Sequence, residues 1–178
     1  MMNLRQLIFL AAVVGLAFFR ILPHPPNFTP VLAMALFAGT FVSGRSLHER
    51  LPNYLLPILA LVLSDAFIGF HWLSPVVYLI YGGVAWLGSY NKTEDGVDYV
   101  KVVAGVVASP IAFFLVSNFA VWLQGALYPR TMTGLLECYT LAIPFFGYTL
   151  MSTFIYSMIL FGGHFVIERW AQQLKQAA

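Results

Sequence analysis

The chain alternates between long apolar runs and shorter polar stretches. A helix needs ~20 mostly apolar residues to cross a hydrocarbon core of about 30 Å. Six runs approach or reach this length, and polar stretches at 43–50, 88–97 and 117–138 separate several of them. The pattern predicts an all-α integral membrane protein, with six transmembrane helices in one domain over residues 1–178. The runs are Leu7–Leu22, Pro30–Val42, Tyr54–Phe70, Pro75–Leu87, Val97–Val116 and Tyr139–Phe161.

Two of these runs are weak candidates for full spans. The apolar part of the second, Val31–Val42, covers only about 18 Å as a helix, so we expect it to extend into its flanks or to lie where the protein is thin. The fourth run is interrupted by Gly82 and Gly83. Its start, Ser74-Pro75, is typical of an N-cap followed by proline at the first helical position.

Composition supports the membrane assignment. Sixty per cent of the residues are hydrophobic and only 9% are charged, against about 25% charged residues in soluble domains. A net charge of only +2 produces too weak a positive electrostatic field to favour binding of nucleic acid. The single cysteine, Cys138, cannot form an internal disulfide.

The distribution of cations predicts the orientation. With the N-terminus inside, the inner segments carry seven Lys or Arg residues and the outer ends carry two. This asymmetry predicts a multi-pass protein of a bacterial inner membrane, with both termini cytoplasmic. The inner cations are Arg5, Arg45, Arg50, Lys92, Lys101, Arg169 and Lys175, and the outer ones are Arg20 and Arg130.

Two inner segments have simple interpretations. The mixed-sign stretch from Asn91 to Asp98 is typical of a face toward water, with a partner-docking loop as the alternative. The last segment, 165–175, alternates apolar and polar residues. It is interpreted either as an interfacial amphipathic end or as the solvated tail of the sixth helix.

The polar and aromatic residues capable of chemistry gather on the outer side. A stiff segment with four prolines, residues 22–30, follows the first run. Aromatic walls with a few polar groups are typical of a small-molecule pocket, and such a pocket would open to the outside. The candidate substrate-binding residues are Arg20, His24, Asn27, Asp65, His71, Tyr78, Asn118, Trp122 and Arg130.

Several alternatives remain open for these residues. A carboxylate inside a membrane needs a partner or a wet cavity, so Asp65 either pairs structurally with Arg20 or contacts a ligand. His24 and His71 could bind a metal, but no metal-binding spacing supports this, and no metal or cofactor is predicted. No GxSxG, P-loop or HExxH motif is present, so the chain is not predicted to be an enzyme.

Small residues form ridges on three of the predicted helices. Ala11 and Gly15, then Ala35 and Gly39, are each four residues apart, and the third ridge is Ala104, Ala108 and Ala112. Such ridges let helices approach closely in lipid. We expect most of them to pack within the bundle, and one could instead dock another membrane subunit.

Four short motifs carry a family resemblance. The stretches Arg20–Gly39, Leu63–Ala66, Asn118–Trp122 and Tyr128–Arg130 resemble an uncharacterised bacterial family described as transport proteins. More distantly, the chain is similar to the substrate-binding S components of energy-coupling factor vitamin transporters, which include solitary cobalamin-type relatives.

The resemblance implies a six-helix S-component-like bundle with an outward cavity lined by His24, Asp65 and Arg130. The cobalamin relatives present a cysteine to cobalt near the third outer element. Residues 71–81 contain none here, which leaves His24 as the candidate axial ligand. The expected function is uptake of a vitamin-like micronutrient, with a corrinoid as one option and an energising ATPase module as a potential partner. The alternative is a non-transporting accessory subunit of a larger membrane complex.

Overall fold

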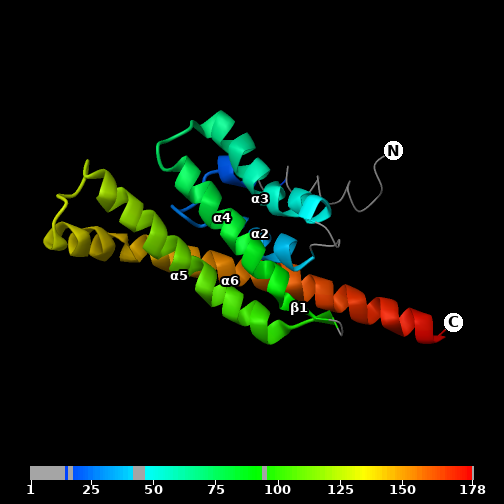
Figure 1. The fold of residues 1–178 in the computed structure, drawn as a ribbon. Coiled ribbons are helices and arrows are strands. Elements are labelled where there is room, and N and C mark those ends of the chain that lie inside the picture. Colours follow the sequence, from blue (N-terminus) through cyan, green and yellow to red (C-terminus); the bar gives the residue numbers. More distant parts are fainter. Residues whose placement is uncertain (1–14, 16–17, 42–46, 94–95, 178) are drawn as a thin grey trace.

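The computed structural model describes residues 15, 18–41, 47–93 and 96–177, and over these residues the chain is mostly helical (Figure 1). Residues 18–21 are helical, but most of the first predicted span lies outside the described residues, as do Ala11, Arg5 and Arg45. The described part is mostly helical, as predicted, and contains one short strand pair. Its main helices are α2 (Val31–Thr40), α3 (Leu47–Ile68), α4 (Ser74–Gly88), α5 (Tyr99–Gln124) and α6 (Met132–Ala177).

Helices α5 and α6 are long and apolar enough to cross a membrane. They contain 26 and 46 residues, or about 39 and 69 Å at 1.5 Å per residue. Figure 1 shows α3 to α6 running in alternating directions, so the turn after α3 and the turn after α5 lie toward the same end. The fourth helix runs without a break through Gly82 and Gly83.

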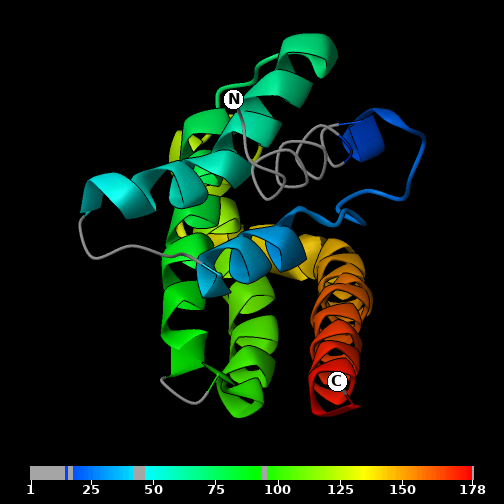
Figure 2. The ribbon, with the colours of Figure 1, turned by 90° about the vertical axis from the view of Figure 1, so that its right-hand side faces the viewer.

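Helix α2 departs from the expected second span. It contains ten residues, about 15 Å of helix, and every residue except Phe37 is buried. Figure 2 shows α2 lying across the bundle, between α4 and α6. The second apolar run therefore forms an enclosed core helix, which explains why it is both short and apolar on all sides.

Close backbone contact holds α2 against α4. A Cβ atom added to Gly39 would lie 1.8 Å from the carbonyl oxygen of Ala85, and one added to Gly88 would lie 2.2 Å from that of Leu36. The two glycines therefore allow an approach that any side chain would prevent. The predicted Ala35–Gly39 ridge packs within the bundle, since both residues are buried.

The ridge of alanines on α5 is not packed within the bundle. Ala104, Ala108 and Ala112 are all exposed, although Gly105 on the same helix is buried. A Cβ on Gly105 would meet the side chain of Leu36. Helix α5 thus faces the core with Gly105 and turns its alanines outward.

The predicted polar connection from Ser117 to Cys138 is wrong. Helix α5 continues to Gln124 and α6 begins at Met132, so only residues 125–131 connect them. Ser117 Oγ donates to the carbonyl oxygen of Phe113 at 2.6 Å, one turn back. This hydrogen bond lets a polar residue remain inside the helix, and the polarity of the sequence therefore does not mark a loop.

The connection after α4 is also more ordered than expected. It contains a 3-10 turn, η1 (Ser89–Asn91), and a two-residue antiparallel pair, β1 (Lys92–Thr93) with β2 (Gly96–Val97). Lys92 and Thr93 are exposed as predicted, but Asn91 is buried. Its Nδ2 donates to Thr40 Oγ1 at 3.1 Å, which ties this connection to the end of α2.

The last segment, residues 165–174, continues α6 as one helix. Its apolar side chains, including Val166, Ile167 and Trp170, are exposed. The structure therefore shows a tail of the sixth helix, while contact with a membrane surface stays a prediction.

Acid should weaken the start of α5. Asp98 caps this helix by accepting hydrogen bonds from the backbone N–H groups of Lys101 and Val100. These bonds, led by that of Lys101, lower the pKa of Asp98 below its ordinary value of 3.8. The cap therefore stabilises the folded state above pH 3.8, and this contribution is lost as the pH falls through the lowered pKa. We expect amide exchange in the first turn of α5, corrected for intrinsic pH dependence, to accelerate in that range.

The substitution Asp98→Asn provides the control for this prediction. Asparagine also caps helices but does not titrate. In the Asp98→Asn variant, protection of the first-turn amides of α5 against exchange should stay constant between pH 5 and pH 3. An equal loss of protection in the wild type and the variant would contradict the assignment of Asp98 as the titrating cap.

Candidate functional site

An ion pair links the first helical segment to α3. Arg20 Nη1 lies 2.8 Å from Asp65 Oδ1, and the same nitrogen donates to Ser64 Oγ and, at 3.4 Å, to the carbonyl oxygen of Leu61. The side chains of Arg20 and Asp65 are 18% and 3% exposed. The predicted partnership of these two charges is confirmed.

Helix α4 completes the surroundings of the carboxylate. Tyr78 Oη donates to Asp65 Oδ2 at 2.7 Å, and Ser74 Oγ donates to the same oxygen at 3.2 Å. The predicted role of Ser74 as an N-cap is wrong, because Leu73 occupies that position. The Ser74 hydroxyl is instead directed to Asp65, so both carboxylate oxygens have partners.

A cavity of about 400 Å³ lies beside this network. Its apolar wall includes Leu73 and Phe113, and the bundle encloses it between the 22–30 segment and helices α2 to α6. This volume falls within the range of small-molecule sites, about 300–1,000 Å³. Polar groups come from Arg20, His24, Asn27, Thr29, His71, Tyr81 and Thr149.

A second cavity of about 170 Å³ adjoins the first. The two share Asn27, Leu73, Phe113 and Thr149 as lining residues. The smaller cavity has four phenylalanines in its lining and also contacts Asn118, whose Nδ2 donates to the carbonyl oxygen of Phe114 at 2.7 Å. Together they form a larger chamber with a smaller extension, and both are lined by a mixture of polar and apolar side chains.

Local contacts constrain the proline-rich segment at Asn27 and His24. Asn27 has φ of +63°, a left-handed conformation that is uncommon for residues other than glycine, and its carbonyl oxygen accepts from Ser152 Oγ at 3.5 Å. His24 Nδ1 lies 2.6 Å from the carbonyl oxygen of Leu22. Because a carbonyl only accepts, Nδ1 carries the hydrogen. In the neutral ring, Nε2 is therefore left as an acceptor.

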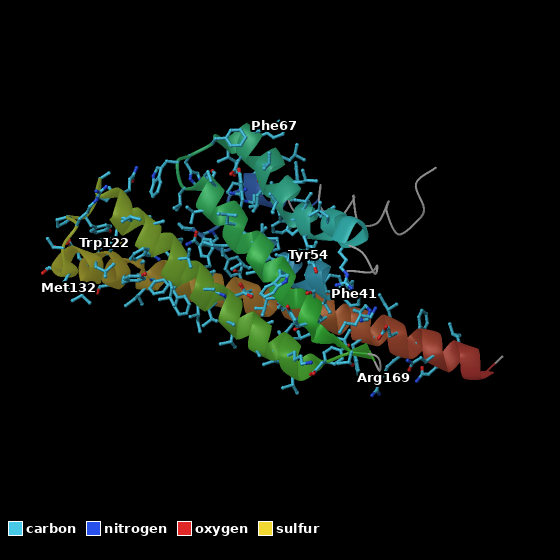
Figure 3. The ribbon with its side chains drawn as sticks, in the orientation of Figure 1. Phe41, Tyr54, Phe67, Trp122, Met132 and Arg169 are labelled. Carbon is cyan, nitrogen blue, oxygen red and sulfur yellow. The ribbon has the colours of Figure 1, made fainter. Side chains whose placement is uncertain are left out.

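Two predicted site residues lie elsewhere. Trp122 Nε1 donates to the carbonyl oxygens of Pro129 and Thr131, at 3.1 and 3.2 Å, and Arg130 Nη2 donates to that of Gln124 at 3.0 Å. Figure 3 shows Trp122 near Met132, at the end where α5 and α6 meet. Both side chains close the turn between the helices and line neither cavity. The expectation that Arg130 lines the pocket is corrected accordingly. The same correction applies to Asp65 and Tyr78, which hydrogen-bond each other beside the larger cavity but line neither one.

Several lining residues could not be predicted from the sequence. Thr29, Phe113 and Thr149 lie in the apolar runs or beside a proline, where nothing in the local pattern separates a lining residue from a packing residue. Cys138 is buried, and its Sγ donates to the carbonyl oxygen of Asn118 at 3.4 Å. The thiol therefore joins α5 to α6.

The charges and donors define what the site can bind. Arg20 is compensated by Asp65, so this pair adds no net charge to the cavity wall. His24 and Asn27 supply acceptors, and Asn27 also supplies donors. No group of three or more His, Cys, Asp or Glu side chains that could hold a metal occurs within the described part of the chain. The geometry suits a small organic molecule rich in hydrogen-bonding groups.

Comparison with known proteins identifies one family. Residues 1–174 match the model of DUF6580, a family of unknown function. No curated protein and no solved structure shows a significant match to the chain.

Proposed function

We propose that this chain, which belongs to the DUF6580 family, is a membrane-embedded protein that binds a vitamin-like micronutrient for uptake. The observation that carries the proposal is the polar cavity of about 400 Å³ between the 22–30 segment and the bundle. In the proposed orientation, this cavity faces the periplasm of a bacterial inner membrane, and both termini are cytoplasmic.

Exposed apolar surface supports the membrane location. Phe67, Leu79, Val100 and Leu127 are each more than 70% exposed. Figure 3 shows the Phe67 side chain at the C-terminal end of α3. Extensive apolar exposure marks contact with a membrane or another protein, and two helices here are long and apolar enough to cross a bilayer.

Cavity volume narrows the class of ligand. A corrinoid, with its macrocycle and many side chains, is too large to be enclosed by chambers of about 400 and 170 Å³. A compound with a single heteroaromatic or similarly compact head fits the larger chamber. We therefore favour a smaller vitamin-like molecule, which His24 would contact by hydrogen bonding rather than by coordinating cobalt.

Uptake also needs a means of release. A ligand held tightly on one side leaves on the other only if a second conformation binds it less well. An energising ATPase module could drive that change, and the proposal includes such a partner.

Binding assays should place the ligand in the larger cavity. We expect the purified protein to retain a small molecule detectable by mass spectrometry, or to bind one member of a panel of water-soluble vitamins by calorimetry. His24→Ala removes an acceptor and should weaken binding about tenfold, the equivalent of one hydrogen bond of about 1.4 kcal/mol. Asn27→Gly should act similarly while preserving the left-handed backbone.

The matched control is Trp122→Phe, which alters the turn outside both cavities and should bind like the wild type. Failure of the wild-type protein to bind any compound would overturn the proposal. Equal affinities of the wild type and both cavity variants would also overturn it.

One observation favours the alternative of an accessory subunit. Ala104, Ala108 and Ala112 are exposed on α5, and small residues of this spacing allow close helix contact in lipid. An accessory subunit would purify with a stoichiometric membrane partner and without a small molecule. Ala108→Leu would then release the partner, whereas the micronutrient proposal expects no effect of this substitution on ligand binding.

A further inference from the structure

An apolar groove separates α5 from α6 near the start of α5. The two helices are in contact near the turn that joins them, where Cys138 Sγ donates to the carbonyl oxygen of Asn118. Figure 2 shows them apart at the opposite end. The groove has a volume of about 520 Å³, and Tyr99 and Ser157 are its only lining residues with polar side chains. Val103, Met158 and Gly162 are among the others.

The dimensions of the groove match one leaflet of a bilayer. On α6 the lining residues extend from Phe154 to Phe165, about 16 Å along the helix axis. Half of a hydrocarbon core of about 30 Å is nearly the same length. If Tyr99 lies at the membrane surface, where tyrosine is enriched, the groove reaches the bilayer midplane. One fatty acyl chain would occupy it along this length.

The surface end of the groove carries paired charges. The ring of Phe165 packs edge-on against that of Tyr99, with centroids 5.6 Å apart, and the guanidinium of Arg169 lies 4.7 Å from the centroid of Phe165. Lys101 Nζ lies 3.4 Å from Asp98 Oδ2 on α5. Glu168 adjoins Arg169 on α6 and lies 3.5 Å from His164 Nε2. Two permanently charged cations, Lys101 and Arg169, thus flank the surface end of the groove. The carboxylates of Asp98 and Glu168 flank the same end.

We propose that the groove binds one phospholipid of the phosphatidylethanolamine type from the adjacent leaflet. One acyl chain lies between α5 and α6, and the phosphate contacts Lys101 and Arg169. The ammonium group of the same lipid faces Asp98 and Glu168. The balance of charges favours a zwitterionic headgroup over an anionic one. This inference depends on membrane embedding and is independent of any ligand in the polar cavity.

Native mass spectrometry of the detergent-purified full chain tests the acyl-chain site. The protein is incubated with equal amounts of palmitoyl-oleoyl phosphatidylethanolamine, phosphatidylglycerol and phosphatidylcholine. The wild type should retain one phosphatidylethanolamine preferentially. Gly162→Leu should reduce that adduct at least fivefold, because a Cβ at Gly162 meets no atom within 4 Å and the side chain can fill the groove.

Gly163→Leu is the matched control. A Cβ at Gly163 also meets nothing within 4 Å, but this residue does not line the groove. Both substitutions should therefore preserve the fold, which circular dichroism checks. Loss of the adduct in Gly162→Leu alone supports the proposal. Equal adducts in the two variants, or no retained lipid on the wild type, would overturn it.

Charge substitutions test the headgroup contacts separately. The double variant Asp98→Asn, Glu168→Gln should lose the preference for phosphatidylethanolamine over phosphatidylcholine, because both lipids carry the phosphate and only the primary ammonium donates hydrogen bonds to carboxylates. Lys92→Gln, which removes an exposed cation on β1, should retain it. A wild-type preference for phosphatidylglycerol, or an unchanged preference in the double variant, would contradict the assigned headgroup.

Discussion

Replacing Gly39 with alanine should prevent α2 from packing in its native position. The added Cβ would lie 1.8 Å from the carbonyl oxygen of Ala85 and 2.7 Å from its carbon. Both are backbone atoms of α4, so no side-chain rotation can make room. The two helices must separate. Overpacking typically costs about 1–3 kcal/mol and occasionally more, and a clash with backbone atoms belongs at the upper end of this range. We expect a large fall in the unfolding midpoint, measured in detergent micelles with increasing denaturant.

The same substitution at Gly83 is the control. Gly83 is exposed on α4, and a Cβ there meets no atom within 4 Å. Alanine is favoured over glycine in a helix by up to about 1 kcal/mol, so Gly83→Ala should be neutral or stabilising. A Gly39→Ala protein as stable as Gly83→Ala would show that α2 and α4 are not in close contact.

The sequence predicted where helices form better than it predicted their depth in the bundle. Apolar runs identified α2 to α6, because burial and lipid both demand apolar side chains. They could not distinguish α2, which is enclosed by protein, from a helix surrounded by lipid. Local polarity was also a poor guide to helix ends. Ser117 and Asn118 satisfy their side chains on carbonyls one turn back, so α5 passes through a stretch expected to be a loop.

The candidate site could likewise be predicted only in part from the sequence. The partnership of Arg20 with Asp65 could be predicted, because two charges in an apolar chain have few other ways to be stabilised. The contribution of Ser74 could not, because its position before a proline equally favoured a helix cap. Trp122 and Arg130 were assigned to a pocket by their chemistry alone. Their actual role depends on the geometry of a seven-residue turn, which the spacing of polar residues does not encode.

Replacing Asp65 with alanine should have a large effect on stability. The carboxylate is almost completely buried and accepts hydrogen bonds from Arg20, Tyr78 and Ser74. Its loss leaves the guanidinium of Arg20, which is only 18% exposed, without a counter-charge. Removing one partner of a buried pair costs about 3–5 kcal/mol. We expect a corresponding loss in the free energy of unfolding, measured by reversible denaturation in mixed micelles.

A double-mutant cycle separates the structural role of this pair from ligand contact. Arg20→Met should also destabilise the protein, because it leaves Asp65 buried without its counter-charge. The double variant Arg20→Met, Asp65→Ala should be more stable than the sum of the two single effects predicts, by at least about 1 kcal/mol. Asp65 does not line the cavity, whereas Arg20 does. If Asp65→Ala instead kept wild-type stability and lost only ligand binding, Asp65 would be a binding residue and the structural assignment would be wrong.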